Sequence, residues 1–338
     1  MDINPEVSIV IPVYNGSNFL REAIDSALAQ TYTNFEILVV DDGSTDDTWK
    51  IIQSYGDEIR GIHKANGGVA SALNCGIRNM RGKYFAWLSH DDLWLPDKLE
   101  KQIHFFEVNS NYKICYSDYF VIDFSGKVLK TVETPWYPRQ KAIRELFKSG
   151  YINGCTIIVE KTCFDKVGLF SEQLKYTQDN EMWIRLSREY EMGRVPEKLM
   201  NQRRHSLQGS KNISPFFSEK TSMLDDAFLS FGIDELFPEC QTIREIPKKK
   251  AKAYNWFGNS MSHYRHQFDL AEKYYKKSIE IYPSWQNTAR IYLLKNMFDK
   301  NFSTILKNKY FDSISKKGEQ YITGHYNLYR LCRWLIRN

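Results

Sequence analysis

VSIVIPVYNGSNFLREAIDSALAQTYTNFEILVVDDGSTDDT, residues 7–48, is the stretch that decides the fold. Residues 7–13 form a largely apolar, β-branched run of strand length, and residues 35–40 (FEILVV) form a second one. A strand that is apolar on both faces is usually buried in a parallel sheet. Between the runs, apolar side chains recur at three- and four-residue spacing, as in an amphipathic helix. The stretch therefore predicts a strand, a helix and a second, parallel strand.

The same alternation continues beyond this stretch. We expect a short helix around Trp49 that stops at Gly56, with Ser44 or Thr45 as its cap. Strands are then expected over 59–64 and 84–88, with a helix between them over 69–80. Strict alternation with short connections favours a doubly wound, mostly parallel α/β sheet over residues 1 to about 125.

The bulk properties narrow the class of protein. In 338 residues, 46 Lys and Arg face 41 Asp and Glu, and this excess of +5 gives no reason to expect a nucleic-acid partner. The six cysteines have no metal-ligand spacing, and the first residues lack a secretion-signal pattern. No apolar run reaches the roughly 18 residues of a membrane-spanning helix. We therefore expect a cytoplasmic protein with reduced thiols.

Two pairs of adjacent carboxylates follow predicted strands. Asp41 and Asp42 end the second strand, and Asp91 and Asp92 follow the fourth. In open α/β sheets, ligands bind at this carboxyl edge. Repulsion between neighbouring carboxylates is relieved by a cation, and oxygen ligands favour Mg2+ or Mn2+, which leave positions free for phosphates. The alternative is that both pairs only form turns and helix caps, a frequent fate of D-D-G-S sequences.

Other phosphate-binding patterns are absent from the sequence. There is no G-x-x-x-x-G-K-[ST] loop and no G-x-G-x-x-G after the first strand, so neither a P-loop nor a dinucleotide site is predicted. Asn66-Gly67-Gly68 opens a helix and would let backbone amides approach a ligand, or it is a plain turn. We count Asn66 among the candidate ligand-binding residues.

Taken in order, these motifs resemble the inverting glycosyltransferases of family 2, whose fold is called GT-A. The matching segments are VSIVIPVYNG (7–16), SALAQTYTNFEILVVDDGSTDDT (26–48), ANGGVASALNCGI (65–77), GKYFAWLSHDDLWLPDKLEKQI (82–103) and YTQDNEMWIRLS (176–187). The resemblance covers about 1–210. It implies transfer of a sugar from a nucleotide-diphosphate sugar, with a UDP-sugar favoured, to a saccharide or lipid-linked saccharide in bacterial surface-polysaccharide synthesis.

The resemblance also implies roles for residues that bind the donor. Pro12, Tyr14 and Asp42 would line the nucleoside pocket, with Asp42 accepting a hydrogen bond from the base. Asp91 would approach the ribose or the sugar, and Asp92 would bind the Mn2+ or Mg2+ ion that bridges the diphosphate.

Asp179 would be the catalytic base, which takes the proton of the acceptor hydroxyl as that oxygen attacks the anomeric carbon. The alternative is an acidic first turn of a helix. The chain departs from the family at Gln178, where Glu is usual, and at Leu73, where Arg is usual. Residues 201–205 (NQRRH) resemble the closing R-x-H segment, from which Arg203, Arg204 or His205 would contact the diphosphate. A solvated basic turn is the alternative for that segment.

The composition changes after residue 210, so we expect a catalytic domain over 1–210. A linker or irregular helical segment would follow over 211–250, and a helical region over 251–338. Residues 268–283 resemble one tetratricopeptide helix pair, which we expect to pack on the catalytic domain or on a protein partner. Residues 328–337 mix basic and bulky apolar side chains, as in a helix lying at the inner face of the cell membrane, or they form a docked terminal helix.

Two other functions remain open from the sequence. The first is a non-catalytic binding or scaffold protein with a glycosyltransferase-like fold, although the presence of Asp42, Asp91, Asp92 and Asp179 together speaks against it. The second is a nucleotidyltransferase, which would be expected to carry a Gly-rich basic phosphate loop after the first strand. That loop is missing.

Overall fold

The structure is a computed structural model that describes residues 4–205, 208, 213–231, 235, 246–262 and 268–281. The chain divides into two compact units, Met1–Ala227 and Phe228–Asn338, and each is described by itself. The division at residues 210 and 250 that the sequence suggested stays a prediction.

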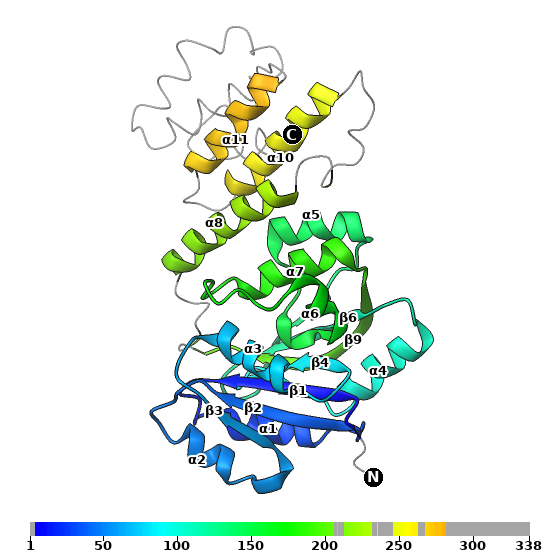
Figure 1. Cartoon of the computed structure of the whole chain (residues 1–338), viewed down its shortest axis with the longest axis vertical. Coiled ribbons are helices and arrows are strands. Elements are labelled where there is room, and N and C mark those ends of the chain that lie inside the picture. Colours follow the sequence, from blue (N-terminus) through cyan, green and yellow to red (C-terminus); the bar gives the residue numbers. More distant parts are fainter. Residues whose placement is uncertain are drawn as a thin grey trace. The chain divides into compact units, whose positions relative to one another are not determined.

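The first unit is built around a nine-stranded sheet with the strand order β3-β2-β1-β4-β8-β6-β9-β5, to which β7 is added beside β6 (Figure 1). Its first half contains β1 (Val7–Val13), β2 (Phe35–Asp41), β3 (Arg60–His63) and β4 (Tyr84–Trp87). β1 pairs in parallel with both β2 and β4, and β2 pairs in parallel with β3. The parallel arrangement predicted for these four strands is confirmed.

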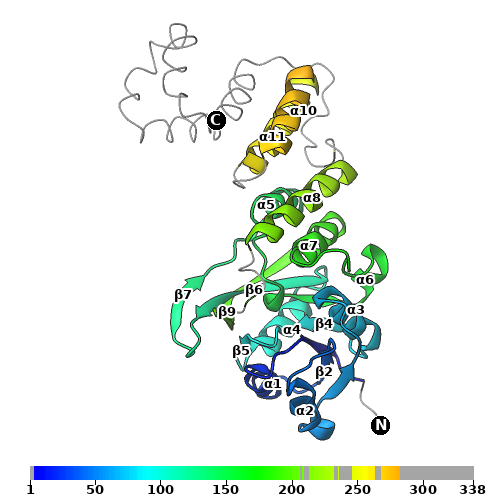
Figure 2. The same cartoon turned by 90° about the vertical axis from the view of Figure 1, so that its left-hand side faces the viewer.

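The second half of the sheet makes it mixed. It contains β5 (Leu93–Trp94), β6 (Ile114–Ile122), β7 (Val128–Val132), β8 (Ile158–Glu160) and β9 (Met192–Arg203). β8 runs antiparallel to both β4 and β6, whereas β9 runs parallel to β6 and antiparallel to β5. β7 forms a hairpin with β6 at the side of the sheet (Figure 2). The long strand β9 thereby brings the chain back beside the end of β4.

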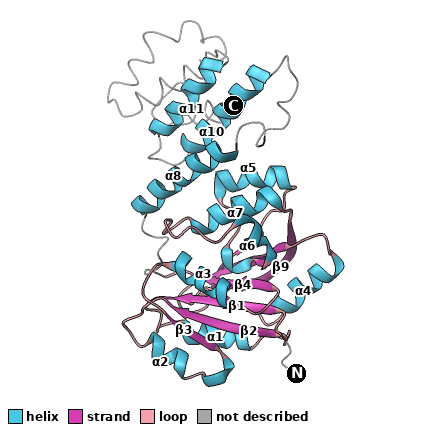
Figure 3. Cartoon of the chain, viewed as in Figure 1, coloured by secondary structure: helices cyan, strands magenta, loops and turns pink. Residues whose placement is uncertain are grey.

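Helices pack around this sheet (Figure 3). They are α1 (Leu20–Leu28), α2 (Thr48–Gln53), α3 (Val69–Asn79), α4 (Lys98–Val108), α5 (Arg139–Ser149), α6 (Thr162–Val167) and α7 (Gln178–Glu189), with 3-10 turns at Gly56–Glu58 and Gly154–Thr156. α8 (Ile213–Phe231) follows β9 and continues past the end of the first unit at Ala227. The first helix shows how the sequence pattern becomes packing. α1 buries Leu20, Ala23, Ile24 and Ala27, the stripe that the spacing predicted. Each fully buried Leu or Ile contributes about 1.5–3 kcal/mol.

The expected cap of α2 is wrong. α2 begins at Thr48, and neither Ser44 nor Thr45 caps it. Ser44 Oγ instead accepts a hydrogen bond from the backbone N of Asn15 at 2.8 Å. The Ser44 side chain joins two loops that are distant in the sequence. A contact of this kind cannot be predicted from the local sequence pattern.

The second unit contains the helix pair α10 (Ile246–Ser262) and α11 (Phe268–Ile281). Residues 268–281 form one helix, and the likeness of 268–283 to a tetratricopeptide helix pair stays a prediction. Ser278 Oγ donates to the backbone O of Ala251 at 2.7 Å, and the hydroxyl of Tyr275 donates to Asn259 Oδ1 at 2.7 Å. Residues 282–338, which include the basic apolar stretch 328–337, lie outside the described residues. Within the described ranges, no helix is both long and apolar enough to cross a membrane.

Candidate active site

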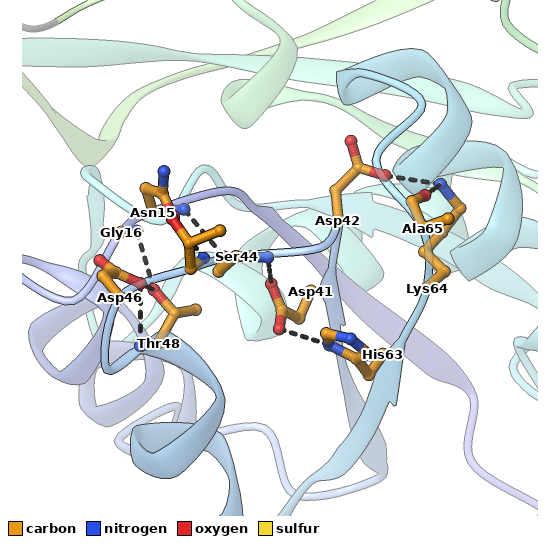
Figure 4. Close-up of polar contacts among 11 residues, drawn as sticks. Asn15, Gly16, Asp41, Asp42, Ser44, Asp46, Thr48, His63, Lys64 and Ala65 are labelled. Carbon is orange, nitrogen blue, oxygen red and sulfur yellow. Dashed lines mark hydrogen bonds and ion pairs between the residues drawn. The ribbon is translucent and has the colours of Figure 1, made fainter.

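The loops that follow β1 and β2 are joined to each other (Figure 4). Asn15 Oδ1 accepts from the backbone N of Thr45 at 2.8 Å, and the backbone N of Gly16 donates to Thr48 Oγ1 at 2.9 Å. Asp41 is fully buried; one carboxylate oxygen accepts from the N of Ser44 at 3.0 Å. Asp41 therefore has the structural role, a turn former at the end of β2.

Asp46 completes this junction. Its carboxylate accepts from Ser17 N at 3.2 Å, from Thr48 N at 3.0 Å and from Thr48 Oγ1 at 2.5 Å. Burial alone would raise the pKa of Asp46, but the hydrogen bonds from Thr48 and Ser17 outweigh it and lower that pKa to about 2. An ionised carboxylate thus holds the two loops together at neutral pH.

Asp42 holds a third loop. The side chain is 2% exposed, and its carboxylate accepts from Lys64 Nζ at 2.5 Å, from Gly67 N at 3.0 Å and from Gly68 N at 2.7 Å. The backbone amides at Asn66-Gly67-Gly68 therefore approach Asp42, while Asn66 itself is exposed. Asp42 orders the loop over which a nucleoside would lie. Its contact with a base stays a prediction.

Gly43 lets these loops come together. Its φ of +77° lies in the left-handed region, and a Cβ at this position would meet the backbone N of Asn66 at 2.9 Å and the O of Lys64 at 3.1 Å. Residues with side chains rarely adopt such a φ. The turn after Asp42 thus needs glycine for its conformation and for its close approach to the neighbouring loop.

Pro12 and Tyr14 lie at the end of β1. Pro12 is buried and pairs with Val40 in the sheet register, so it lies beneath this edge of the sheet. Tyr14 is 50% exposed. An exposed aromatic ring beside an ordered loop is suited to stacking on a planar base.

Asp91 and Asp92 follow β4, where the end of β9 lies against them. Asp92 is 4% exposed, and its Oδ1 accepts from the backbone N of Arg203 at 2.9 Å. Burial and the charge of Asp91 raise the pKa of Asp92 well above its usual range. Asp91 Oδ2 lies 2.9 Å from His205 Nε2. The structure thus brings Asp91, Asp92 and His205 together, three of the residues singled out in the sequence.

The side chain of Arg203 is fully engaged in packing. Its Nη2 donates to Glu22 Oε2 at 2.6 Å, its Nη1 donates to the backbone O of Phe124 at 2.7 Å, and its guanidinium lies 4.6 Å from the ring centre of Phe19. With 3% of the side chain exposed, Arg203 clamps the end of β9 onto α1. Arg203 Nε donates to the backbone O of Asp91 at 3.2 Å, whereas His205 contacts the Asp91 carboxylate.

The side chains at this edge can be compared with the ligands that the expected Mg2+ or Mn2+ ion prefers. In the part of the chain that the structure describes, no three His, Cys, Asp or Glu side chains form a metal-binding group. His205 Nδ1 is buried and has no hydrogen-bond partner among those residues. Mg2+ and Mn2+ are commonly bound by one or two carboxylates together with substrate phosphates. Asp91, Asp92 and His205 fit an ion held jointly with a diphosphate and do not fit a closed protein cage.

Asp179 lies in the first turn of α7. Its side chain is partly exposed, and its Oδ1 accepts from the backbone N of Asn180 at 2.7 Å. Desolvation by the surrounding protein raises the pKa of Asp179, against the opposing effects of the Asn180 amide and the Lys220 ammonium group. Among the described residues, no hydrogen bond or ion pair joins Asp179 to Asp91 or Asp92. The structure therefore does not itself link the candidate base to the carboxylate pair.

Sequence reasoning missed several residues that build this region. Lys64, the partner of Asp42, carried a weak signal because it is the last residue of a predicted parallel strand. Asn74 is 1% exposed; its Nδ2 donates to the backbone O of Phe170 and its Oδ1 accepts from the N of Phe170, both at 2.9 Å. Glu219 of α8 binds the backbone just before Asp179. Asn74 and Glu219 gave no usable signal because their partners are far away in the sequence.

Known proteins resemble this chain in sequence. The family described as "Glycosyl transferase family 2" matches residues 8–166. An uncharacterised glycosyltransferase of Rickettsia prowazekii is 48% identical over 209 residues, which are 61% of this chain and 66% of that protein's length. The Escherichia coli protein WfaP, named as a UDP-Glc:alpha-D-GlcNAc-diphosphoundecaprenol beta-1,3-glucosyltransferase, is 32% identical over 184 residues, or 53% of this chain and 69% of WfaP.

Solved structures show the same fold. Staphylococcus aureus TarS, residues 1–349 in complex with UDP-GlcNAc, matches with a TM-score of 0.57 at 16% identity, over 86% of this chain and 92% of that one. The family match covers the half of the sheet that carries both aspartate pairs, and WfaP is matched over more than two thirds of its length. The chain therefore belongs to glycosyl transferase family 2, with a GT-A fold.

Proposed function

We propose that the chain is an inverting, metal-dependent glycosyltransferase that moves a sugar from a UDP-sugar to a saccharide or lipid-linked saccharide. The observation that carries the proposal is the grouping of Asp91, Asp92 and His205 at the carboxyl end of β4. Two carboxylates, and a buried imidazole nitrogen that has no partner among the described residues, need a cation and its ligand to balance them. A metal-bound diphosphate meets that need.

The donor would lie along the carboxyl edge of β1, β2 and β4. Tyr14 offers an exposed ring for the base, and Pro12 shapes the floor beneath it. Asp42 and Asn66 belong to the ordered loop beside it. A UDP-sugar is preferred because TarS, which has the same fold, is described in complexes with UDP-GlcNAc and with UDP.

Asp92, with Asp91 and His205 beside it, would hold Mn2+ or Mg2+. When bound, the ion supplies Lewis-acid stabilisation of the departing diphosphate. The protein contributes the orientation of these side chains. Arg203 contributes to it because its backbone N binds Asp92 and its side chain locks β9 against α1.

Asp179 would act as the base. The acceptor hydroxyl gives its proton to the Asp179 carboxylate, its oxygen forms the bond to the anomeric carbon, and the bond from that carbon to the diphosphate breaks to release UDP. A raised pKa makes the carboxylate a stronger base for the acceptor proton. Attack from the face opposite to the leaving group inverts the anomeric carbon.

The acceptor is proposed to be lipid-linked because WfaP and WfgD of Escherichia coli are both named for diphosphoundecaprenol-linked acceptors. Such an acceptor would place the protein at the inner face of the cell membrane. The terminal stretch proposed for membrane contact and the protein partner of the helical region both remain proposals.

A donor panel tests this function. Purified protein is incubated with UDP-, GDP- and dTDP-sugars, with Mn2+ or Mg2+ or with a chelator, and both the melting temperature and nucleotide release are measured. We expect UDP release that a chelator abolishes and that Asp92→Asn reduces by about 100-fold, since an electrostatic catalytic group typically contributes that much. Asp57→Asn, an exposed acid in a 3-10 turn, is the matched control and should behave as wild type.

The same panel separates the rival functions. A binding or scaffold protein would show a melting-temperature shift with a donor and no nucleotide release. A nucleotidyltransferase would consume nucleoside triphosphates and release pyrophosphate. If no UDP-sugar is bound or turned over, the proposed function is wrong.

A further inference from the structure

Helix α8 reaches the backbone just ahead of the proposed base. Glu219 Oε1 accepts from the backbone N of Tyr176 at 2.8 Å, from the N of Thr177 at 2.8 Å and from Thr177 Oγ1 at 2.8 Å. Its Oε2 accepts from the backbone N of Lys175 at 2.7 Å. A single carboxylate therefore accepts four hydrogen bonds from three consecutive residues that lead into α7.

These contacts cover the backbone donors that precede the first turn of α7. Thr177 is the N-cap residue of the helix, and its side chain makes no capping bond to the helix backbone. Glu219 instead holds the three residues that lead into the helix, and its charge complements the positive end of the helix dipole. Asp179 follows two residues after Thr177, so the position of its carboxylate depends on how firmly 175–177 is held.

Lys220, the next residue of α8, carries the opposite charge to Glu219. It is 8% exposed, and burial lowers the pKa of Lys220 while the charge of Asp179 raises it. Around Asp179 itself, desolvation and the charge of Glu219 raise its pKa, and the ammonium group of Lys220 lowers it. Two adjacent residues of one helix thus shift the pKa of Asp179 in opposite directions.

We infer that Glu219 is a positioning residue for Asp179. The inference rests on the proposed function, and it makes α8 part of the catalytic unit although this helix lies beyond the residues 8–166 that match the family. Glu219 does not touch the reacting atoms and acts through the position of the Asp179 carboxylate.

The test compares Glu219→Gln and Lys220→Met with wild type and with Asp226→Asn, an exposed acid on the same helix. The donor is whichever of UDP-glucose and UDP-GlcNAc gives the higher turnover, and kcat and KM are measured across pH. Gln retains one acceptor oxygen, but its amide nitrogen cannot accept from Lys175 N. We expect kcat of Glu219→Gln to fall about 10- to 100-fold while the donor KM changes less than about 3-fold, because misplacing a catalytic group has effects of that size.

The pH profile supplies a readout that a purely structural role would not move. Activity falls on the acid side as Asp179 becomes protonated. Loss of the positive charge in Lys220→Met should move this acid limb to higher pH, and loss of the negative charge in Glu219→Gln should move it to lower pH. Acid limbs that stay in place, or that move in the same direction in both variants, would overturn the inference.

Hydrogen exchange gives a second readout that does not need activity. Exchange of the peptide containing 174–181 should be at least about 10-fold faster in Glu219→Gln than in wild type, while the peptide of β2 should be unchanged. Equal exchange of 174–181 in both proteins would contradict the inference.

If Asp179→Asn is inactive and Glu219→Gln has wild-type kcat, only this inference fails. If Asp179→Asn is fully active, the proposed function fails with it.

Discussion

Replacing Lys98 by Met should remove a pH dependence from the free energy of unfolding. Lys98 is fully buried in α4, where its Nζ donates to Gln102 Oε1 at 2.5 Å and lies 4.2 Å from the ring centre of Trp94. Burial lowers the pKa of Lys98 from 10.5 to about 7. Between these values the unfolded chain holds a proton on this amine that the folded chain lacks.

The sign follows from that difference. Where the unfolded state binds more protons, stability rises with pH, by up to about 1.4 kcal/mol per pH unit for one proton. From pH 7.5 to 9.5 this single group should therefore add about 2–3 kcal/mol to the stability of the wild type. Met has a similar length and no titrating group, so Lys98→Met should lack that increment. The lost hydrogen bond to Gln102 changes the stability by an amount that does not depend on pH, so it leaves the slope unaffected.

The assay is urea unfolding of wild type, Lys98→Met and Lys130→Met at pH 7.5, 8.5 and 9.5. Lys130 is exposed in β7 and provides the matched control. The stability of wild type minus that of Lys98→Met should grow by about 2 kcal/mol across this range, and the Lys130→Met difference should stay flat. A difference that is constant with pH, or that shrinks as pH rises, refutes the reasoning about this buried amine.

Three further changes test the loops of the site by urea unfolding. Asp42→Asn should destabilise the protein by about 2–3 kcal/mol, because hydrogen bonds to a charged group are lost; an unchanged midpoint would contradict this role. Asn74→Ala should lower stability by about 2–4 kcal/mol, since it leaves the backbone N and O of Phe170 without their partner; a loss below 1 kcal/mol would show that water replaces the amide. Gly43→Ala should destabilise by about 1–3 kcal/mol through its positive φ and the contact with Asn66, and should weaken the melting-temperature shift given by a UDP-sugar; full donor response would argue that this turn does not shape the site.

The sequence predicted the parallel half of the sheet well because β1, β4 and most of β2 are buried on both faces. β1 is buried at all seven positions, and the helix that follows has a clear apolar stripe. The second half was not predicted. β7 is exposed at nearly every position and β5 has two residues, so neither has a hydrophobic period from which a strand could be recognised.

The residues of the candidate site could likewise be predicted only in part. Asp91, Asp92 and His205 could be brought together from sequence because strand ends and a family motif marked them. The hydrogen bonds of Asp42 and Glu219 could not be predicted from the sequence. They join residues 22 to 44 positions apart and depend on how loops and helices pack. Side chains that satisfy distant backbone amides leave no periodic trace in the sequence.

The most direct test of the central claim measures turnover and donor affinity of wild type and Asp179→Asn in the same samples. UDP release from the UDP-sugar chosen by the donor panel gives turnover, and the melting-temperature shift gives binding. Asn keeps the shape of Asp179 but cannot take a proton from an acceptor. The account predicts that Asp179→Asn binds the donor as wild type does and has lost transfer. Turnover near the wild-type rate would contradict it.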